Sequence, residues 1–469
     1  MSLRSFAYTR ILWPATNPAC RGLSARMAAL RRRERQPLEE NLTRQWAGVE
    51  RLLGYAWAHS PFHRQRMEAV GAAPEAIRRP EDLTQIPALT RGDIKQNLRQ
   101  LCSDEFRFED LLAAATGGTT DTPVPLRREP QAVARREAVQ QMFWEWAGVQ
   151  PGAKVFWLWG AQSDFPLEPN WKWRLYDRGL MRREWAATAP LDSTVFEGYR
   201  QRLNRFRPEA VCAYPTPLFL FCEYLRDCGL PVHRPRAVIC TAEALLPHQR
   251  PVIEAALGAP VYVHYGSRDS GMVAAECEAH AGLHLHTEAC YLEFVPLAGG
   301  DGTVREILLT DLTNYAMPLI RYRIGDCVLG GAPPAACACG RGLPLLPPIA
   351  GRTTDTFRLP DGRMVPGVAL TNRVIQEAPA LAKTQIVQET LRDFRVRYVP
   401  APGFTPRDLE PLQRKLVEFL GSDVRWQFEA VEEIEREANG KTRFCISHLS
   451  GAGAGAAASP QGTELGGQP

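Results

Sequence analysis

The stretches AVCAY at residues 210–214, AVICT at 237–241 and PVYVHY at 260–265 decide the fold. Each is a short apolar run, as expected of a strand that is buried on both faces. Helical stretches at 218–228 and 247–257 lie between them. Strand, helix, strand, helix and strand with short connections predict a right-handed parallel sheet that is covered by helices.

The segments that follow these three strands predict a ligand site. They are YPTP at 214–217, TAEAL at 241–245 and YGSRDSG at 265–271, and each is polar or contains glycine. In open parallel sheets, ligands bind beyond the carboxyl ends of the strands. We therefore expect the functional residues to gather at this edge of the sheet.

The length of 469 residues and the change of pattern near residue 350 predict more than one domain. Residues 28–350 are expected to form a large α/β N-terminal domain with mostly parallel sheets flanked by helices. Residues 351–450 read as a small α+β domain, in which strand-like pieces surround a helix at 405–420. Residues 1–27 are poorly patterned and 451–469 are rich in glycine and alanine, so both ends are expected to be disordered.

The composition excludes some partners. Lys and Arg number 56 against 52 Asp and Glu, a balance that argues against a nucleic acid or an anionic membrane as partner. No run approaches twenty apolar residues, and the N-terminus has basic residues and prolines where a signal peptide needs an apolar centre. We expect no membrane span and a cytoplasmic location. The twelve cysteines are scattered, so most are expected to be reduced thiols.

The stretch TGGTTDTP at 116–123 predicts a loop that binds phosphate. Adjacent glycines let successive backbone N–H groups converge on an anion, and threonine hydroxyls add donors. An ordinary glycine-rich turn is the alternative, since such loops are common. No lysine follows the second glycine, so this is not a Walker loop. The candidate phosphate contacts are Thr116, Gly117, Gly118, Thr119 and Thr120.

Five more motifs follow the loop in order: TAEAL at 241–245, HYGSRDSG at 264–271, RYRIGD at 321–326, GRTTD at 351–355 and NGKTR at 439–443. The six together resemble the adenylate-forming superfamily, in the branch of phenylacetate-CoA ligase and the capsule-biosynthesis CapK-type proteins. The resemblance extends from the helix near Leu38, through LLGYAWAHSPFHRQRM and DLTQIPALTRGDI, to Arg443, which is most of the chain.

This resemblance implies an AMP-forming acid–thiol ligase that uses ATP, magnesium and CoA. A carboxylate attacks the α-phosphate of ATP to give an acyl adenylate and pyrophosphate, and the CoA thiol then displaces AMP. It also implies a homodimer and a small, mobile C-terminal domain that rotates between the two half-reactions.

The resemblance also assigns roles to individual residues. The loop from Thr116 to Thr120 would hold the β- and γ-phosphates, and Asp269 would hold magnesium. The remaining nucleotide contacts would be Glu243, Tyr265, Gly266, Ser267, Asp326 and Arg352. Lys441 would reach in from the small domain as the catalytic residue, where an ammonium stabilises the charge that shifts during attack.

Three of these residues have simpler interpretations. Glu243 would suit the N-terminus of the helix expected near Pro247, since acidic residues favour that end. Asp326 would suit a turn after glycine. Lys441 would suit a solvated turn between two strands.

The chain departs from the family pattern at three places. Asp121 and Thr122 stand where glycine and often lysine precede the proline, which removes one cationic phosphate contact. Asp269 stands where glutamate is usual, one methylene shorter. The hinge after Arg352 leaves the pivot open between Thr354 and Asp355.

A candidate zinc site consists of Cys277, His284, Cys337 and Cys339. Three thiolates and an imidazole make a complete tetrahedral set for zinc. The alternatives are four unrelated side chains, or His280 in place of His284 as ligand. Some relatives in this branch are similar in carrying a structural zinc, which here would tie together the loops of Asp269 and Asp326.

The acid and the acceptor stay open. Aromatic residues near the expected acyl pocket, Tyr214, Trp157 and Trp159, together with His264, favour an aryl or arylacetic acid, although such a cluster also suits core packing. The alternatives to a CoA ligase are an adenylating ligase with an amine, hydroxyl or carrier-protein acceptor, as in CapK-like biosynthesis, and a degenerate nucleotide-binding protein.

Overall fold

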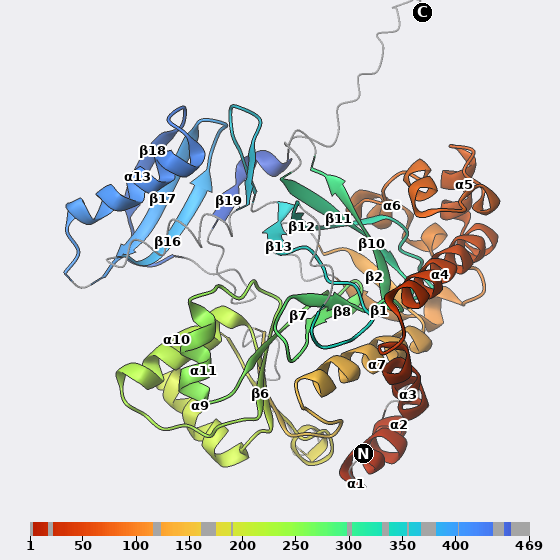
Figure 1. Ribbon diagram of the computed structural model, residues 1–469, viewed down its shortest axis with the longest axis horizontal. Helices are drawn as coiled ribbons and strands as arrows, with labels where there is room; N and C mark the ends of the chain where they lie inside the picture. The colour runs from red at the N-terminus through yellow and green to blue at the C-terminus, as the bar shows by residue number, and fades with distance from the viewer. Residues whose placement is uncertain are drawn as a thin grey trace, which may run out of the picture. The chain divides into compact units, whose positions relative to one another are not determined.

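The computed structural model describes residues 3–16, 22–115, 123–160, 175–188, 191–297, 303–330, 337–353, 356–366, 381–401, 403–434 and 445–451. By their contacts these residues divide into two compact units, one that runs up to Ala350 and one that begins at Gly351 (Figure 1). No helix in the described ranges combines the length and the apolar character that crossing a membrane requires.

A seven-stranded sheet organises the first unit. The three strands predicted from apolar runs are present as β5, β6 and β7, and β3 to β7 are paired in parallel. The sheet then continues through the antiparallel strands β8 and β9. In spatial order the strands are β4 (Arg183–Ala186), β3 (Val155–Leu158), β5 (Ala210–Ala213), β6 (Ala237–Thr241), β7 (Val261–Ser267), β8 (Gly271–Glu276) and β9 (Leu283–Leu285).

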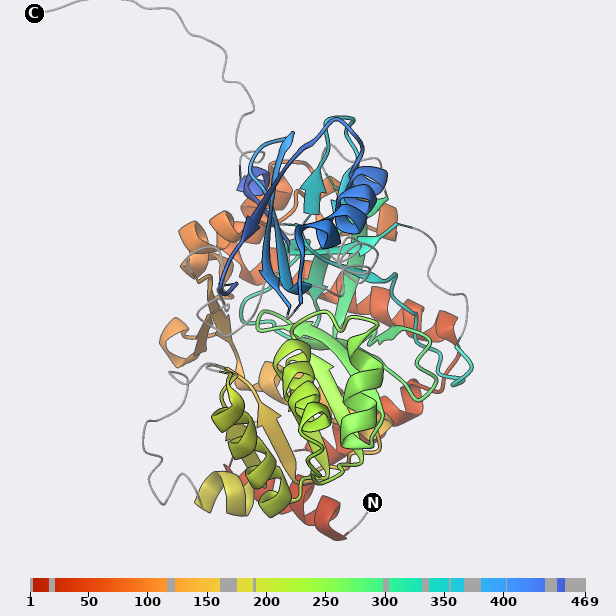
Figure 2. The same ribbon diagram turned by 90° about the vertical axis from the view of Figure 1, so that its left-hand side faces the viewer.

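Helices cover both faces of this sheet. Alternate residues of each strand face opposite sides, so Val211 packs in one apolar cluster with α9–α11 while Cys212 packs in another with Trp144 of α7. Figures 1 and 2 show α9, α10 and α11 side by side. The helices are α7 (Pro130–Trp146), α9 (Ser193–Phe206), α10 (Pro215–Asp227) and α11 (Gln249–Leu257). The expected α/β fold with helix-flanked parallel strands is confirmed.

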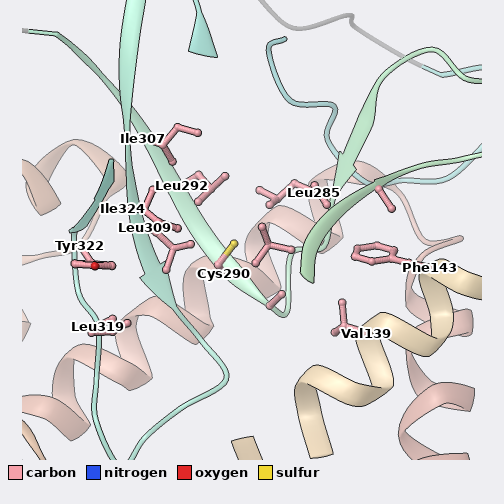
Figure 3. Close-up of a cluster of buried hydrophobic side chains, with 14 of the residues drawn as sticks. Val139, Phe143, Leu285, Cys290, Leu292, Ile307, Leu309, Leu319, Tyr322 and Ile324 are labelled. Carbon is pink, nitrogen blue, oxygen red and sulfur yellow. The ribbon is translucent and has the colours of Figure 1, made fainter. Parts of the chain in front are cut away.

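A second sheet lies beyond β9 in the chain, and the sequence interpretation did not anticipate it. Its first three strands are antiparallel. Side chains of these strands pack with Val139 and Phe143 of α7 and form the largest core of the unit (Figure 3). The strands are β10 (Cys290–Pro296), β11 (Val304–Asp311), β12 (Tyr322–Leu329) and β13 (Ile349–Arg352).

The N-terminal region corrects one expectation. Residues 3–16 and 22–27, expected to be disordered, are helical and packed. Leu23 and Met27 are buried in the main core, and Arg4 forms an ion pair with Glu209 at 2.6 Å. These contacts come from distant segments, so local patterning does not reveal them. The helical segments are α1 (Leu3–Ala7), η1 (Tyr8–Leu12), α2 (Trp13–Thr16) and α3 (Leu23–Arg33).

Three longer helices and a hairpin complete the first unit. The helix expected near Leu38 corresponds to α4, which starts after Pro37. The elements are α4 (Leu38–His59), α5 (Pro61–Glu68), α6 (Arg91–Leu101), β1 (Leu112–Ala115) and β2 (Pro125–Arg128).

The second unit is a four-stranded sheet with a helix, as the α+β pattern predicts. The helix α13 (Leu409–Leu420) buries Leu412 and Leu416 against Phe394 and Val396. The sheet order is β18 (Arg425–Ala430), β17 (Asp393–Pro400), β16 (Leu381–Gln388) and β19 (Cys445–Ser447), and the hairpin β14 (Thr356–Arg358) and β15 (Met364–Pro366) precedes it.

Candidate active site and metal centre

Glu243 joins the ends of two neighbouring parallel strands. It follows β6, and its Oε2 accepts a hydrogen bond of 3.2 Å from the backbone N of Thr216, in the first turn of α10 after β5. The expected alternative, a cap on the helix near Pro247, is wrong in detail, because α11 begins at Gln249 and Glu243 contacts α10 instead. Glu243 therefore lies at the edge of the sheet where ligands bind.

Tyr265 and Asp326 connect the two sheets of the first unit. The Tyr265 hydroxyl donates to Asp326 Oδ2 at 2.9 Å, and the Asp326 side chain is buried. Asp326 lies inside β12 rather than in a turn, so the turn interpretation is wrong. A buried carboxylate beside the end of β7 is a suitable acceptor for two ligand hydroxyls.

Residue 266 must be glycine, because the neighbouring strand leaves no room for a side chain. The register of β7 and β8 shifts at a bulge between Tyr265 and Gly266. A Cβ at residue 266 would lie 2.3 Å from the backbone O of Gly271 and 2.6 Å from Cα of Met272. Any side chain here would push the two strands apart, so the backbone itself forms this part of the site.

The Asp269 turn is held by hydrogen bonds from both sides. Ser267 Oγ accepts from the backbone N of Asp269 at 3.1 Å and of Ser270 at 3.3 Å. Arg136 Nη2 donates to the backbone O of Asp269 at 2.7 Å. Ser267 thus orders the turn, and the buried Asp269 carboxyl is a hard oxygen ligand of the kind magnesium prefers.

Arg136 is a buried cation that sequence analysis missed. Its Nη2 forms an ion pair with Asp311 Oδ2 at 2.6 Å, and its Nε donates to Thr313 Oγ1 at 2.9 Å. Both charged side chains are buried, and 175 positions separate them in the chain. No local pattern marks Arg136 on α7, because its acidic partner comes from β11, a distant part of the chain.

A second arginine, Arg128, lies in the same electrostatic environment. Burial, and then the charge of Arg136, lowers the pKa of Arg128 to about 10, while the carboxylates of Asp311 and Asp269 raise it. Arg128 also donates to the backbone O of Arg268. The Asp269 turn therefore has two guanidinium groups beside it.

The four candidate zinc ligands converge. Their Sγ and Nε2 or Nδ1 atoms all lie within 4.8 Å of one another. Cys277 Sγ is 3.6 Å from Cys337 Sγ, and Cys339 Sγ is 3.3 Å from His284 Nε2. Ligand atoms of a tetrahedral zinc site are about 3.7 Å apart, so the residues fit a zinc ion.

Hydrogen bonds orient this cluster. His284 Nδ1 is 3.0 Å from the backbone O of Leu343, which leaves Nε2 to face the thiols. His280 is not part of the cluster, since its Nδ1 lies 3.3 Å from Glu276 Oε2. Burial raises the pKa of the Cys277 thiol to about 12, so metal binding there must displace a proton.

Trp146 lies next to the metal cluster. Its ring centroid is 5.9 Å from that of His284, and its Nε1 donates to Glu34 Oε2 at 2.7 Å. The Arg341 guanidinium, two residues after Cys339, stacks over the same indole at 4.5 Å. Trp146 is therefore placed to report on the cluster by fluorescence.

Three of the four residues of the expected acyl pocket form a row of ring contacts. Trp159 lies 4.5 Å from Tyr214 and 5.9 Å from Trp157, measured between ring centroids. The fourth residue, the buried His264, lies beside Phe143 instead. Trp159 and Tyr214 follow β3 and β5 directly, at the carboxyl ends of these strands.

Several predicted site residues fall elsewhere. Arg352 is the last residue of β13, just past the boundary between the units, and its backbone O accepts a hydrogen bond of 3.2 Å from Thr356 Oγ1. The predicted residues that lie outside the described ranges are Thr116, Gly117, Gly118, Thr119, Thr120, Asp121, Thr122, Thr354, Asp355 and Lys441.

Comparison with known proteins agrees with this arrangement. Residues 358–448 match the family model of the CapK C-terminal domain. Protein CapK of Staphylococcus aureus is 24% identical over 380 residues, which cover 78% of this chain and 81% of that protein. The phenylacetate-coenzyme A ligase of Thermus thermophilus is 26% identical over 343 residues, which cover 69% and 72%.

Among solved structures, 2-hydroxyisobutyryl-CoA ligase in the postadenylation state, in complex with 2-HIB-AMP, is similar with a TM-score of 0.70. It is 21% identical, and the match covers 89% of this chain and 91% of that one. The chain therefore has the fold of the adenylate-forming CoA ligases. The resemblance to the branch of phenylacetate-CoA ligase and CapK-type proteins is confirmed, and the C-terminal part is similar to the CapK C-terminal domain.

Proposed function

We propose that this protein is an AMP-forming acid–CoA ligase that activates a carboxylic acid with ATP and transfers the acyl group to CoA. The observation that carries the proposal is the contact between Tyr265 and Asp326, which places a buried carboxylate next to the strand ends that bear Glu243 and Asp269. The names of the relatives, which include phenylacetate-CoA ligases, support the same activity.

In the first half-reaction, a carboxylate oxygen of the acid bonds to the α-phosphorus of ATP, and the bond to the pyrophosphate oxygen breaks. Asp326 accepts hydrogen bonds from the ribose hydroxyls, and Lys441 stabilises the transferring charge. Magnesium, when bound beside Asp269, neutralises phosphate oxygens. In the second half-reaction, the CoA sulfur bonds to the acyl carbon, AMP leaves, and the thiol proton passes to solvent.

Arg128 supplies a cation that the phosphate loop lacks in this proposal. The loop has Asp121 and Thr122 where a lysine often stands. Arg128 follows the loop on β2, and its guanidinium interacts electrostatically with Asp269. A phosphate between Arg128 and the metal at Asp269 would be neutralised from two sides.

The cluster of Cys277, His284, Cys337 and Cys339 is proposed to hold a structural zinc ion. It supplies no open position for chemistry, because all four ligands come from the protein. Cys277 follows the strand after the Asp269 turn, and Cys337 and Cys339 follow the strand of Asp326. The metal would hold these two segments together.

The remaining properties are inferred from the family resemblance. We infer a homodimer in the cytoplasm, a small domain that rotates between half-reactions, and an aryl or arylacetic acid next to Trp159 and Tyr214. The second candidate, which the resemblance to CapK-type proteins implies, is an adenylating ligase with another acceptor.

Product analysis by mass spectrometry tests the activity. The protein is incubated with ATP, magnesium and a mixed library of aryl and aliphatic acids, with and without CoA. AMP together with a CoA thioester is the expected result. AMP or a bound adenylate that does not respond to CoA would instead support the second candidate.

A matched pair of variants tests the catalytic assignment. Lys441→Ala should abolish AMP formation, while Lys415→Ala on α13 removes the same charge and should leave the rate unchanged. Equal rates in both variants would reject Lys441 as the catalytic residue. Absence of AMP from the unmodified protein with every acid would favour a degenerate nucleotide-binding protein.

A further inference from the structure

A cavity of about 550 Å³ lies in the first unit, lined by residues that the proposed reaction does not use. Four arginines from three helices border it: Arg33 at the end of α3, Arg44 and Arg51 on α4, and Arg135 on α7. The volume is in the range of small-molecule sites. Such a concentration of guanidinium groups around one cavity is costly unless anions compensate it.

Two of the four arginines are paired with carboxylates. Arg33 lies 2.6 Å from Glu288, and Arg135 lies 2.9 Å from the buried Glu129. Their charges are therefore largely neutralised within the protein.

Within the described part of the chain, the two arginines of α4 have no acidic partner. Arg44 donates only to neutral groups, the Asn41 Oδ1 at 2.9 Å and the Gln36 Oε1 at 2.8 Å. Arg51 forms no hydrogen bond or ion pair with any residue in the described ranges. The four arginines and the two carboxylates of Glu288 and Glu129 therefore carry a combined charge of two positive units. A ligand with two negative charges would balance it.

The shape of the cavity is maintained by Gly48. Arg44, Gly48 and Arg51 lie on one face of α4, since residues four and three positions apart are neighbours on a helix. A Cβ at Gly48 would lie 3.4 Å from Leu312 Cδ1 and 3.8 Å from Arg51 Nη2. Glycine is disfavoured inside a helix, and here its absent side chain leaves room between the two arginines.

Arg135 is held in place before any ligand arrives. Its Nη1 donates to the backbone O of Thr313 at 2.6 Å, and its guanidinium lies over the Tyr315 ring at 5.4 Å. A fixed guanidinium loses little conformational freedom when it binds, which favours affinity. The Tyr315 ring adds an apolar wall at the same side.

We propose that this cavity binds a small molecule that carries a phosphate group, either free phosphate or a phosphate ester. Guanidinium groups match phosphate oxygens in a bidentate geometry, and a phosphate dianion balances the charges of Arg44 and Arg51. The site does not depend on the proposed ligase activity, because none of its residues contributes to the Asp269 or Asp326 region.

Calorimetric titration of the full chain with two probes tests this proposal. Inorganic phosphate represents the free anion, and phenyl phosphate represents an ester with a ring for Tyr315. Malonate, a dicarboxylate, is titrated in parallel. Saturable binding of phosphate or phenyl phosphate is the expected result, and tighter binding of phenyl phosphate would identify an ester as the preferred source.

Variants locate the binding. Arg44→Gln with Arg51→Gln should weaken binding at least tenfold, and Arg51→Gln alone, which changes an exposed side chain, should weaken it severalfold. Arg205→Gln on α9 removes the same charge from an exposed position away from α4 (Figure 1) and should bind as the unmodified protein does. Equal binding by Arg51→Gln and Arg205→Gln, stronger binding of malonate, or no saturable binding would each overturn the proposal.

Discussion

Replacing Arg136 by methionine should destabilise the first unit and weaken magnesium binding at the Asp269 turn. The change removes an ion pair whose two side chains are both buried, at 2.6 Å, together with the hydrogen bonds to Asp269 O and Thr313 Oγ1. Breaking a buried pair by removal of one partner costs roughly 3–5 kcal/mol. Because Arg128 provides a second cation near Asp311, we expect a loss of about 3 kcal/mol, at the lower end of that range.

Urea unfolding followed by tryptophan fluorescence measures the stability, and the magnesium concentration that gives half-maximal AMP formation measures the site. Arg136→Met should lower the unfolding midpoint and raise this magnesium concentration. The double variant Arg136→Met with Asp311→Asn should recover part of the stability, since it removes the unpaired carboxylate as well.

Arg200→Met is the matched control, because it removes the same group from a half-buried ion pair with Glu197, both on α9. It should leave both measurements unchanged. The interpretation would be refuted if Arg136→Met behaved like this control. It would also be refuted if Asp311→Asn lowered the stability further instead of restoring it.

Three other perturbations have defined outcomes. Burial lowers the pKa of three histidines to about 3, 3 and 4 in the order His63, His264 and His286. The folded state holds these histidines neutral, so it is most stable above pH 6.5 and loses stability as the pH falls toward 4. The three histidines together should lower the free energy of unfolding by about 3 kcal/mol between pH 6.5 and 5.5. Equal urea midpoints at these two pH values would contradict this. Cys339→Ser should lower the zinc content measured by mass spectrometry and change tryptophan emission. Cys228→Ser, at an exposed cysteine, should change neither. Equal zinc content in the two variants would reject the site. Gly266→Ala should destabilise the protein by roughly 1–3 kcal/mol in thermal unfolding because of crowding. Gly54→Ala should not destabilise it, because a Cβ at residue 54 would have no other atom within 4 Å. Equal unfolding temperatures of the two variants would contradict the steric argument.

The parallel strands and their helices could be predicted because their information is local. The apolar runs at 210–214, 237–241 and 260–265 and the amphipathic stretches between them each carry their own periodicity. The four candidate zinc ligands were also predictable as a set, since cysteine and histidine are the residue types that bind zinc. Which histidine completes the set required the fold, because His280 and His284 are only four positions apart.

Arg136 and the N-terminal helices could not be predicted for the opposite reason. Arg136 is buried only because Asp311 and the Asp269 turn approach it from other parts of the chain. The N-terminal segment has no regular apolar spacing, and Leu23 and Met27 become core residues only when the second sheet provides a surface for them. Interactions between distant segments of this kind decide which polar residues are buried.

The crowding at Gly266 affects how this part of the site can change over evolutionary time. Where the wall of a site is formed by side chains, single substitutions can reshape it. Here the backbone of one strand approaches the next so closely that no other amino acid fits at residue 266, so this position is nearly invariant under point mutation. Variation must therefore arise at other positions, and a directed-evolution library that keeps residue 266 fixed would lose no useful variants.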